Sequence, residues 1–109
     1  MKLAIIGSRN LSVDIESYMP SGISEIVSGG ARGIDACAAE YATKKGLKLT
    51  EFFPEYSRYG RAAPIKRNEL IAEYADEAIA FWDGKSKGTK NTIGLFERLG
   101  KRVNVIIVT

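Results

Sequence analysis

The sequence contains no histidine and a single cysteine, Cys37, and both shortages restrict the chemistry that the chain can perform. Without histidine, a Ser-His-Asp or Cys-His nucleophile, an imidazole general base and a histidine-ligated metal site are all excluded. One cysteine forms neither an internal disulfide nor a thiolate zinc site, and it is compatible with a reducing compartment. We therefore expect no metal site.

Long apolar runs are missing as well. The longest, residues 78–82 and 105–108, fall far short of the roughly 20 residues that a membrane-spanning helix needs. At the N-terminus, Lys2 is followed by only four apolar residues before Gly7, too few for the core of a signal peptide. These absences predict a cytoplasmic protein with no membrane association.

The 109 residues fit a single domain, residues 1–109, and a chain of this length buries roughly 65% of its unfolded surface. A net charge of +3 is too small to indicate nucleic-acid binding by itself. The whole excess of basic over acidic residues lies in residues 55–109, which carry ten basic and seven acidic side chains. The second half of the chain is therefore where an anionic partner would be attracted.

Short apolar segments alternate with helical patterns, without repeats or linkers. Strands are expected at residues 3–6, 26–27, 47–53, 77–82 and 103–108. Helices are expected at residues 13–19 with Ser12 as N-cap, 34–45 before Gly46, 64–75 from Pro64, and 88–99 before Gly100. The roughly ten-residue loop before Pro64 is long enough to be a lid or ligand wall. This order predicts a Rossmann-like three-layer α/β sandwich, with a five-stranded parallel sheet and helices on both faces.

Ligands of such sheets bind beyond the carboxyl ends of the strands, where the strand order switches. The predicted loops and helix starts at that edge are rich in basic residues: Arg9, Arg32, Arg58, Arg61, Lys66, Arg67, Lys85, Lys87 and Lys90. We therefore expect an anionic ligand there.

The segment SGGARGID, residues 28–35, follows a strand and opens a helix. Its glycines Gly29, Gly30 and Gly33 would let backbone N–H groups approach a phosphate that the helix dipole also attracts. A structural alternative is a tight turn with close helix packing. The segment follows the second strand and has Ser28 in place of the first glycine of G-x-G-x-x-G, which argues against an ordinary dinucleotide dehydrogenase.

Four motifs in order, LAIIGSR (3–9), SGGARGID (28–35), KRNELIAEYAD (66–76) and SKGT (86–89), resemble the SLOG superfamily of Rossmann-like nucleotide-binding domains. That superfamily includes the Smf/DprA proteins and the LOG phosphoribohydrolases. The chain resembles the small YspA-like branch most in its length and in the sequence of its motifs. The resemblance covers nearly the whole chain. It implies ligand contacts at Gly7, Ser8, Arg9, Gly29, Gly30, Gly33, Arg67, Asn68, Ser86, Gly88 and Thr89. From their places at the predicted carboxyl edge of the sheet, we add Ser28, Arg32, Asp35, Trp82 and Asp83 as candidate ligand-binding residues.

Three of these residues also have a structural interpretation. Asp35 is either a ligand contact or a carboxylate that stabilises the helix dipole and orients its loop. Asp83 could bind a ribose hydroxyl, but Asp-Gly after a strand is also a common turn. Trp82 could stack on a base or simply cover the edge of the sheet.

The chain also departs from its relatives. The catalytic Glu of the LOG motif GTxxE corresponds to Thr92, and the DprA histidine after GIDxxA corresponds to Ala39. The resemblance therefore favours binding or sensing of a nucleotide-derived ligand, such as a nucleoside phosphate, ADP-ribose or NAD-like molecule, with no catalytic residue assigned. Two alternatives stay open: DprA-like binding of single-stranded DNA, and N-glycosidic hydrolysis of a nucleotide in the LOG manner. The resemblance and the apolar helix faces of so short a chain also suggest a homodimer.

Overall fold

A computed structural model describes residues 1–108. One all-parallel sheet with the strand order β3-β2-β1-β4-β5 forms the centre of the molecule. Its strands are β1 (Lys2–Gly7), β2 (Glu25–Ser28), β3 (Lys48–Glu51), β4 (Glu77–Trp82) and β5 (Val103–Ile107). The helices are α1 (Ile34–Lys45), the single turn α2 (Tyr56–Tyr59), α3 (Ala63–Tyr74) and α4 (Lys87–Arg98). The predicted Rossmann-like class is confirmed.

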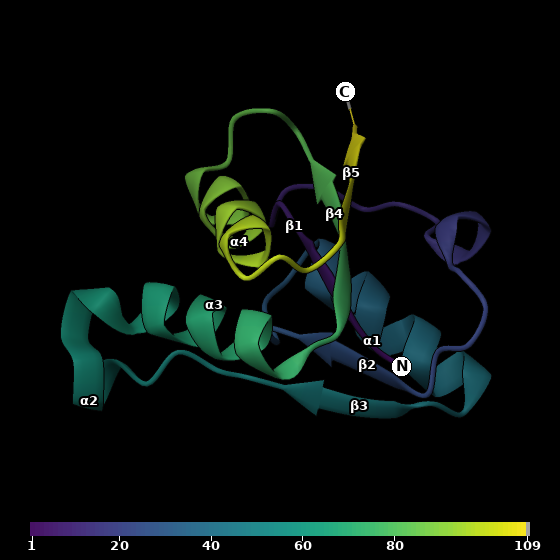
Figure 1. Ribbon diagram of the computed structural model, residues 1–109, viewed down its shortest axis with the longest axis horizontal. Coiled ribbons are helices and arrows are strands. Elements are labelled where there is room, and N and C mark those ends of the chain that lie inside the picture. Colours follow the sequence, from purple (N-terminus) through teal and green to yellow (C-terminus); the bar gives the residue numbers. More distant parts are fainter. Residues whose placement is uncertain (109) are drawn as a thin grey trace.

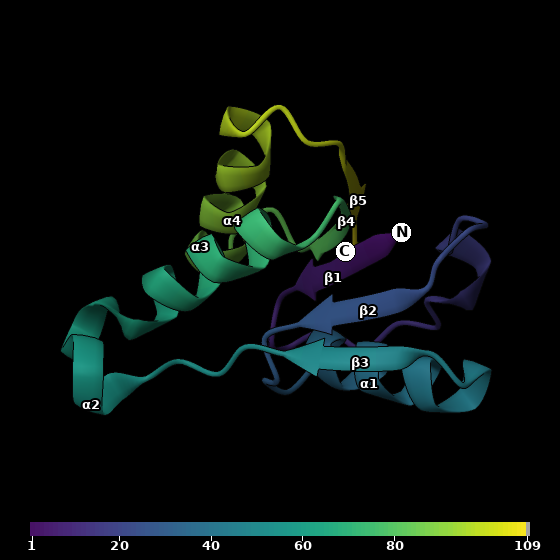
Figure 2. The same ribbon diagram turned by 60° about the horizontal axis from the view of Figure 1, so that its bottom comes forward.

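The helices cover both faces of the sheet, with α1 on one face and α3 and α4 on the other (Figure 2). Alternate residues of β4 pack against the helices on opposite faces of the sheet. Ala78 and Ala80 pack under α3 and α4, whereas Ile79 and Phe81 pack in the cluster that contains α1. A central strand that is buried on both faces reads as a continuous apolar run, as residues 78–82 do.

Most helix ends follow from local signals. Gly46 adopts the left-handed conformation (φ 67°) that ends α1 after two lysines. Pro64 lies in the first turn of α3, where its missing N–H removes no hydrogen bond. At the start of α4, the Ser86 side chain accepts a hydrogen bond from the N–H of Thr89.

The predicted first helix, residues 13–19, is wrong. Only a 3₁₀ turn, Glu16–Tyr18, forms there, and Ser12 caps no helix. Leu11, Val13 and Ile15 alternate with polar residues and pack into the α1 side of the core from an extended chain. The N–H of Glu16 is bound instead by the carboxylate of Asp14, at 3.3 Å.

The predicted loop before Pro64 contains regular structure. It holds α2 and a 3₁₀ turn, Gly60–Ala62, that leads directly into α3. Figures 1 and 2 show α2 projecting beyond the carboxyl ends of the strands, at the far end of α3 from the sheet.

Strand order also locates the candidate site. The crossovers from β1 and β2 lead towards β3, whereas β4 lies on the other side of β1. The switch in direction therefore lies between β1 and β4, where open α/β sheets bind ligands. No helix among residues 1–108 is long and apolar enough to cross a membrane.

The carboxyl end of α3 is closed by one cation, Lys101. Its Nζ donates hydrogen bonds to the backbone carbonyls of Ala72, Glu73 and Ala75, at 2.7, 2.9 and 2.8 Å. These carbonyls lack partners within the helix and carry its negative dipole end, so an ammonium group there stabilises the fold.

Replacing this cation tests its contribution. We expect Lys101→Met to lower the free energy of unfolding by about 2 kcal/mol, because it leaves several carbonyl acceptors without their charged donor. Urea denaturation measures the change, with the exposed loop variant Lys85→Met as control. A loss for Lys101→Met no larger than that of the control would show that the lysine contributes nothing.

Candidate functional site at the carboxyl edge of the sheet

A cavity of about 380 Å³ opens at the carboxyl edge, over the switch between β1 and β4. Each of the three twelve-residue helices contributes residues from its first turns to the wall. The lining includes ten of the predicted site residues: Gly7, Arg9, Gly29, Gly30, Asp35, Arg67, Asn68, Ser86, Gly88 and Thr89. Segments from four loops, distant in sequence, thus meet at one place.

Close backbone packing joins the loop after β1 to the start of α1. The N–H of Ile34 donates to the carbonyl of Ser8 at 3.4 Å, and the N–H of Ser8 donates to the carbonyl of Phe81 at 3.2 Å. A Cβ on Gly7 would lie 2.5 Å from both Ile34 and that Phe81 carbonyl, and one on Gly33 would overlap the backbone of Arg9. Both glycines are therefore required for packing. At Gly33 this agrees with the structural alternative for residues 28–35, a tight turn with close helix packing.

Arg67 is a half-buried cation whose hydrogen-bond partners are all neutral. Its Nη1 donates to the carbonyl of Gly29 at 2.7 Å, and its Nε donates to Asn68 Oδ1 at 2.9 Å. Within residues 1–108, no carboxylate lies within the 4.0 Å ion-pair distance of Arg67 or Arg9. Burial lowers the pKa of Arg67, and the charge of Asp35, which lies beyond ion-pair distance, opposes this effect only in part.

Asp35 is the one carboxylate in the described lining of this cavity. Burial raises its pKa, against the opposing effects of a hydrogen bond from the N–H of Ala31, at 3.1 Å, and of the charge of Arg67. A Cβ on Gly29 would lie 2.6 Å from Arg67 Nη1 and 3.0 Å from Asp35 Oδ2. Gly29 therefore lets both charged groups approach the same point of the wall.

The α3 and α4 side of the cavity is polar. Asn68 is buried and donates from Nδ2 to Asn91 Oδ1 at 3.3 Å. Thr92 is also buried, and its hydroxyl donates to the carbonyl of Gly88 at 3.0 Å. This wall offers hydroxyl and amide groups but no carboxylate.

Six predicted residues lie outside the lining: Ser8, Ser28, Arg32, Gly33, Trp82 and Asp83. Asp83 accepts hydrogen bonds from the N–H groups of Lys85 and Ser86, both at 2.8 Å, which lower its pKa. Trp82 Nε1 donates to the carbonyl of Ser86 at 3.0 Å. Both side chains thus shape the loop before α4, and Arg32 is exposed to solvent.

Phe53, Pro54, Tyr56 and Pro64 line the cavity. Three of these residues, Phe53, Pro54 and Pro64, were not predicted to contact a ligand, whereas Tyr56 belongs to the loop that the sequence predicts to be a lid or ligand wall. Phe53 lies so close to Gly30 that a Cβ there would overlap its ring. The available signal was the unusual length of the segment before Pro64, which predicted a wall that includes Tyr56 but did not indicate Phe53 or Pro54.

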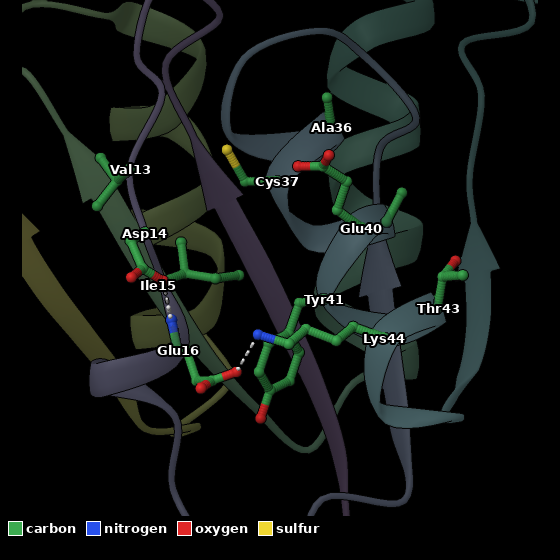
Figure 3. A pocket seen from close by; sticks show the side chains of 11 residues that line it. Val13, Asp14, Ile15, Glu16, Ala36, Cys37, Glu40, Tyr41, Thr43 and Lys44 are labelled. Atoms are coloured by element: carbon green, nitrogen blue, oxygen red, sulfur yellow. Dashed lines mark hydrogen bonds and ion pairs between the residues drawn. The ribbon is translucent and has the colours of Figure 1, made fainter.

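A second cavity, about 790 Å³, lies between α1 and the segment before the 3₁₀ turn (Figure 3). It occupies the place where the predicted first helix is absent. Lys44 pairs with Glu16 across it at 3.1 Å, and none of the predicted site residues lines it. We therefore place the candidate site at the smaller cavity, where the predicted residues converge.

No group of three or more cysteine, aspartate or glutamate side chains within residues 1–108 is arranged to hold a metal ion. Comparison with protein-family models, curated proteins and solved structures gave no match for the chain. The assignment of function therefore depends on the geometry of the site and on the sequence motifs.

Gly33 and Gly60 have nearly the same backbone conformation, so comparing their alanine variants measures the effect of the close contact at Gly33 alone. Gly33 (φ 74°, ψ −126°) faces the backbone of Arg9, whereas a Cβ on Gly60 (φ 56°, ψ −128°) meets nothing within 4 Å. Gly60→Ala should cost only backbone strain, about 1–3 kcal/mol. We expect Gly33→Ala to lower the free energy of unfolding by about 2 kcal/mol more, because the loop after β1 must move. Equal losses in urea denaturation would contradict the packing described.

Proposed function

We propose that the protein binds a phosphate-bearing, nucleotide-derived ligand in the cavity at the carboxyl edge, as a domain of the SLOG type. The observation that carries this proposal is the half-buried guanidinium of Arg67, held by neutral acceptors and facing a cavity that Arg9 also lines. A desolvated cation that no carboxylate contacts within ion-pair distance is costly, and the charge of Asp35 offsets this cost only in part. An anionic ligand would supply a closer counter-charge.

Phosphate suits this place for a second reason. The three long helices all begin at the carboxyl edge, so their positive dipole ends point to the same region. No side chain caps the N-terminus of α1 or α3. Gly29, Gly30 and Gly88 leave backbone without side chains in the wall, where a phosphate oxygen could approach N–H groups.

The remainder of the cavity fits a nucleoside. Phe53 and Tyr56 provide aromatic surface for a base, and Asp35 provides an acceptor for a ribose hydroxyl. A volume of about 380 Å³ lies in the usual range for small-molecule sites and suits a ligand of nucleoside monophosphate size, with larger groups extending into solvent.

No observation favours the two alternatives to the same degree. Hydrolysis in the LOG manner uses a carboxylate where Thr92 stands. For single-stranded DNA, the aromatic and basic residues of α2 would be used. Arg58 lies over the ring of Tyr59 at 5.1 Å and 3.9 Å from a carboxylate oxygen of Glu55, so these groups partly satisfy one another.

Titration calorimetry with AMP, ADP-ribose and NAD tests the proposal. We expect saturable binding of at least one of them, weakened about tenfold or more by Arg9→Gln, because a charge-assisted hydrogen bond contributes about 1.5–3 kcal/mol. The side chain of Arg9 is exposed and makes no hydrogen bond or ion pair within residues 1–108, so its replacement should leave the fold intact. Arg32→Gln is the matched control, since Arg32 lies in a neighbouring loop but outside the cavity, and its affinity should stay within about twofold.

The same titrations separate a nucleotide site from a DNA surface. A nucleotide held in the cavity should show a shallow dependence of affinity on salt. Single-stranded DNA contacting four or five phosphates would give a slope of log affinity against log salt near −3, at about −0.7 for each contact. The proposal would be contradicted if an oligonucleotide bound with submicromolar affinity at physiological salt and none of the nucleotides could displace it.

A further inference from the structure

The outer edge of β5 lacks the features that normally prevent pairing between strands. Among residues 1–108, β5 stands at one edge of the sheet and pairs with β4 alone, and its sequence VNVII contains neither charge nor proline. Natural edge strands are usually protected by lysine, proline, bulges or a covering element. The opposite edge strand, β3, has this protection, because Lys48 and Glu51 stand at its two ends.

The unpaired backbone groups of β5 belong to its odd-numbered residues. The carbonyl of Arg102 accepts from the N–H of Ala78 at 3.0 Å, and the N–H of Val108 donates to the carbonyl of Trp82 at 2.8 Å. Successive residues of a strand direct these groups to opposite sides. The N–H and C=O groups of Val103, Val105 and Ile107 therefore point away from the sheet.

The side chains of these same residues form an apolar row on one face. Val103 packs with the cluster under α3 and α4, and Val105 and Ile107 follow at two-residue spacing, 37% and 57% exposed. The free backbone edge and the exposed apolar side chains thus coincide in one short segment.

We propose that two copies of the chain pair through their β5 edges, antiparallel about a twofold axis at Val105. In this register Val105 faces Val105 of the second copy, and Val103 faces Ile107 of the second copy. Each facing pair exchanges two main-chain hydrogen bonds and joins two β-branched side chains on the same face. The two sheets become one continuous sheet.

The choice of a second copy as the occupant follows from symmetry and charge. Because every odd position of β5 is apolar and β-branched, the strand is its own complement under a twofold rotation. Lys101 and Arg102 precede the strand, and the antiparallel arrangement separates the two Arg102 residues by about 20 Å along the strands. A parallel partner would instead place these cations side by side.

This dimer leaves the candidate site accessible. Antiparallel pairing directs the carboxyl edges of the two sheets to opposite ends of the joined sheet. Each copy therefore keeps its own cavity, and the proposal does not depend on the ligand. Its failure would leave the proposed nucleotide site untouched.

Disulfide trapping tests the register. In a Cys37→Ser background, we expect Val105→Cys to form a disulfide-linked dimer under mild oxidation, because facing residues have Cα atoms about 5.5 Å apart. Ile107→Cys is the matched control. It is more exposed, yet its two copies would be about 14 Å apart along the strands and should remain largely unlinked. Equal linkage of both variants, or none for Val105→Cys, would overturn the register.

Sedimentation equilibrium tests the dimer itself. The wild-type chain should dimerise at micromolar concentration, and Val105→Lys should raise the dissociation constant about tenfold or more, because it places two like charges opposite each other. Ile65→Lys makes a similar change at an exposed residue of α3 and should leave the constant unchanged. A wild-type monomer at high micromolar concentration would overturn the proposal.

Discussion

The absence of a Cβ at three glycines determines how the carboxyl edge is built. Gly7 allows β1 to lie against Ile34 and the end of β4, and Gly33 allows the start of α1 to lie against the backbone of Arg9. Gly29 leaves space for Arg67 and Asp35. With any larger residue, the loops after β1 and β2 would separate. The same contacts that pack α1 onto the sheet therefore also shape the wall of the cavity.

Two charged groups in this wall, the half-buried Arg67 and the buried Asp35, do not form an ion pair with each other. Burial opposes ionisation of both Arg67 and Asp35, and although their charges favour each other, no ion pair joins them within 4.0 Å. Natural proteins accept such costs mainly where a ligand or a reaction later uses the charge. The proposed anion would offset the cost of burying Arg67 whether or not the protein catalyses a reaction.

Much of the fold could be predicted because its signals are local. The apolar run of β4, Gly46 after α1 and Pro64 at the start of α3 each act within a few residues. The prediction of a helix at residues 13–19 failed because Leu11, Val13 and Ile15 follow the two-residue period of an extended chain. Acidic residues in the same segment, which are typical of the first turn of a helix, concealed that period. At the site, motif order indicated which loops converge. It could not show that Arg67 would reach the carbonyl of Gly29, 38 positions away, because this contact depends on the packing of α3.

Amide chemical-shift mapping of the ¹⁵N-labelled protein during titration with AMP or ADP-ribose tests the central claim most directly. If the cavity at the carboxyl edge binds the ligand, the largest saturable shifts will belong to amides of residues 7–9, 29–35 and 86–89. The account would be contradicted if saturating nucleotide produced no shifts, or if the shifts were concentrated in α2 or around the cavity beside Glu16 and Lys44.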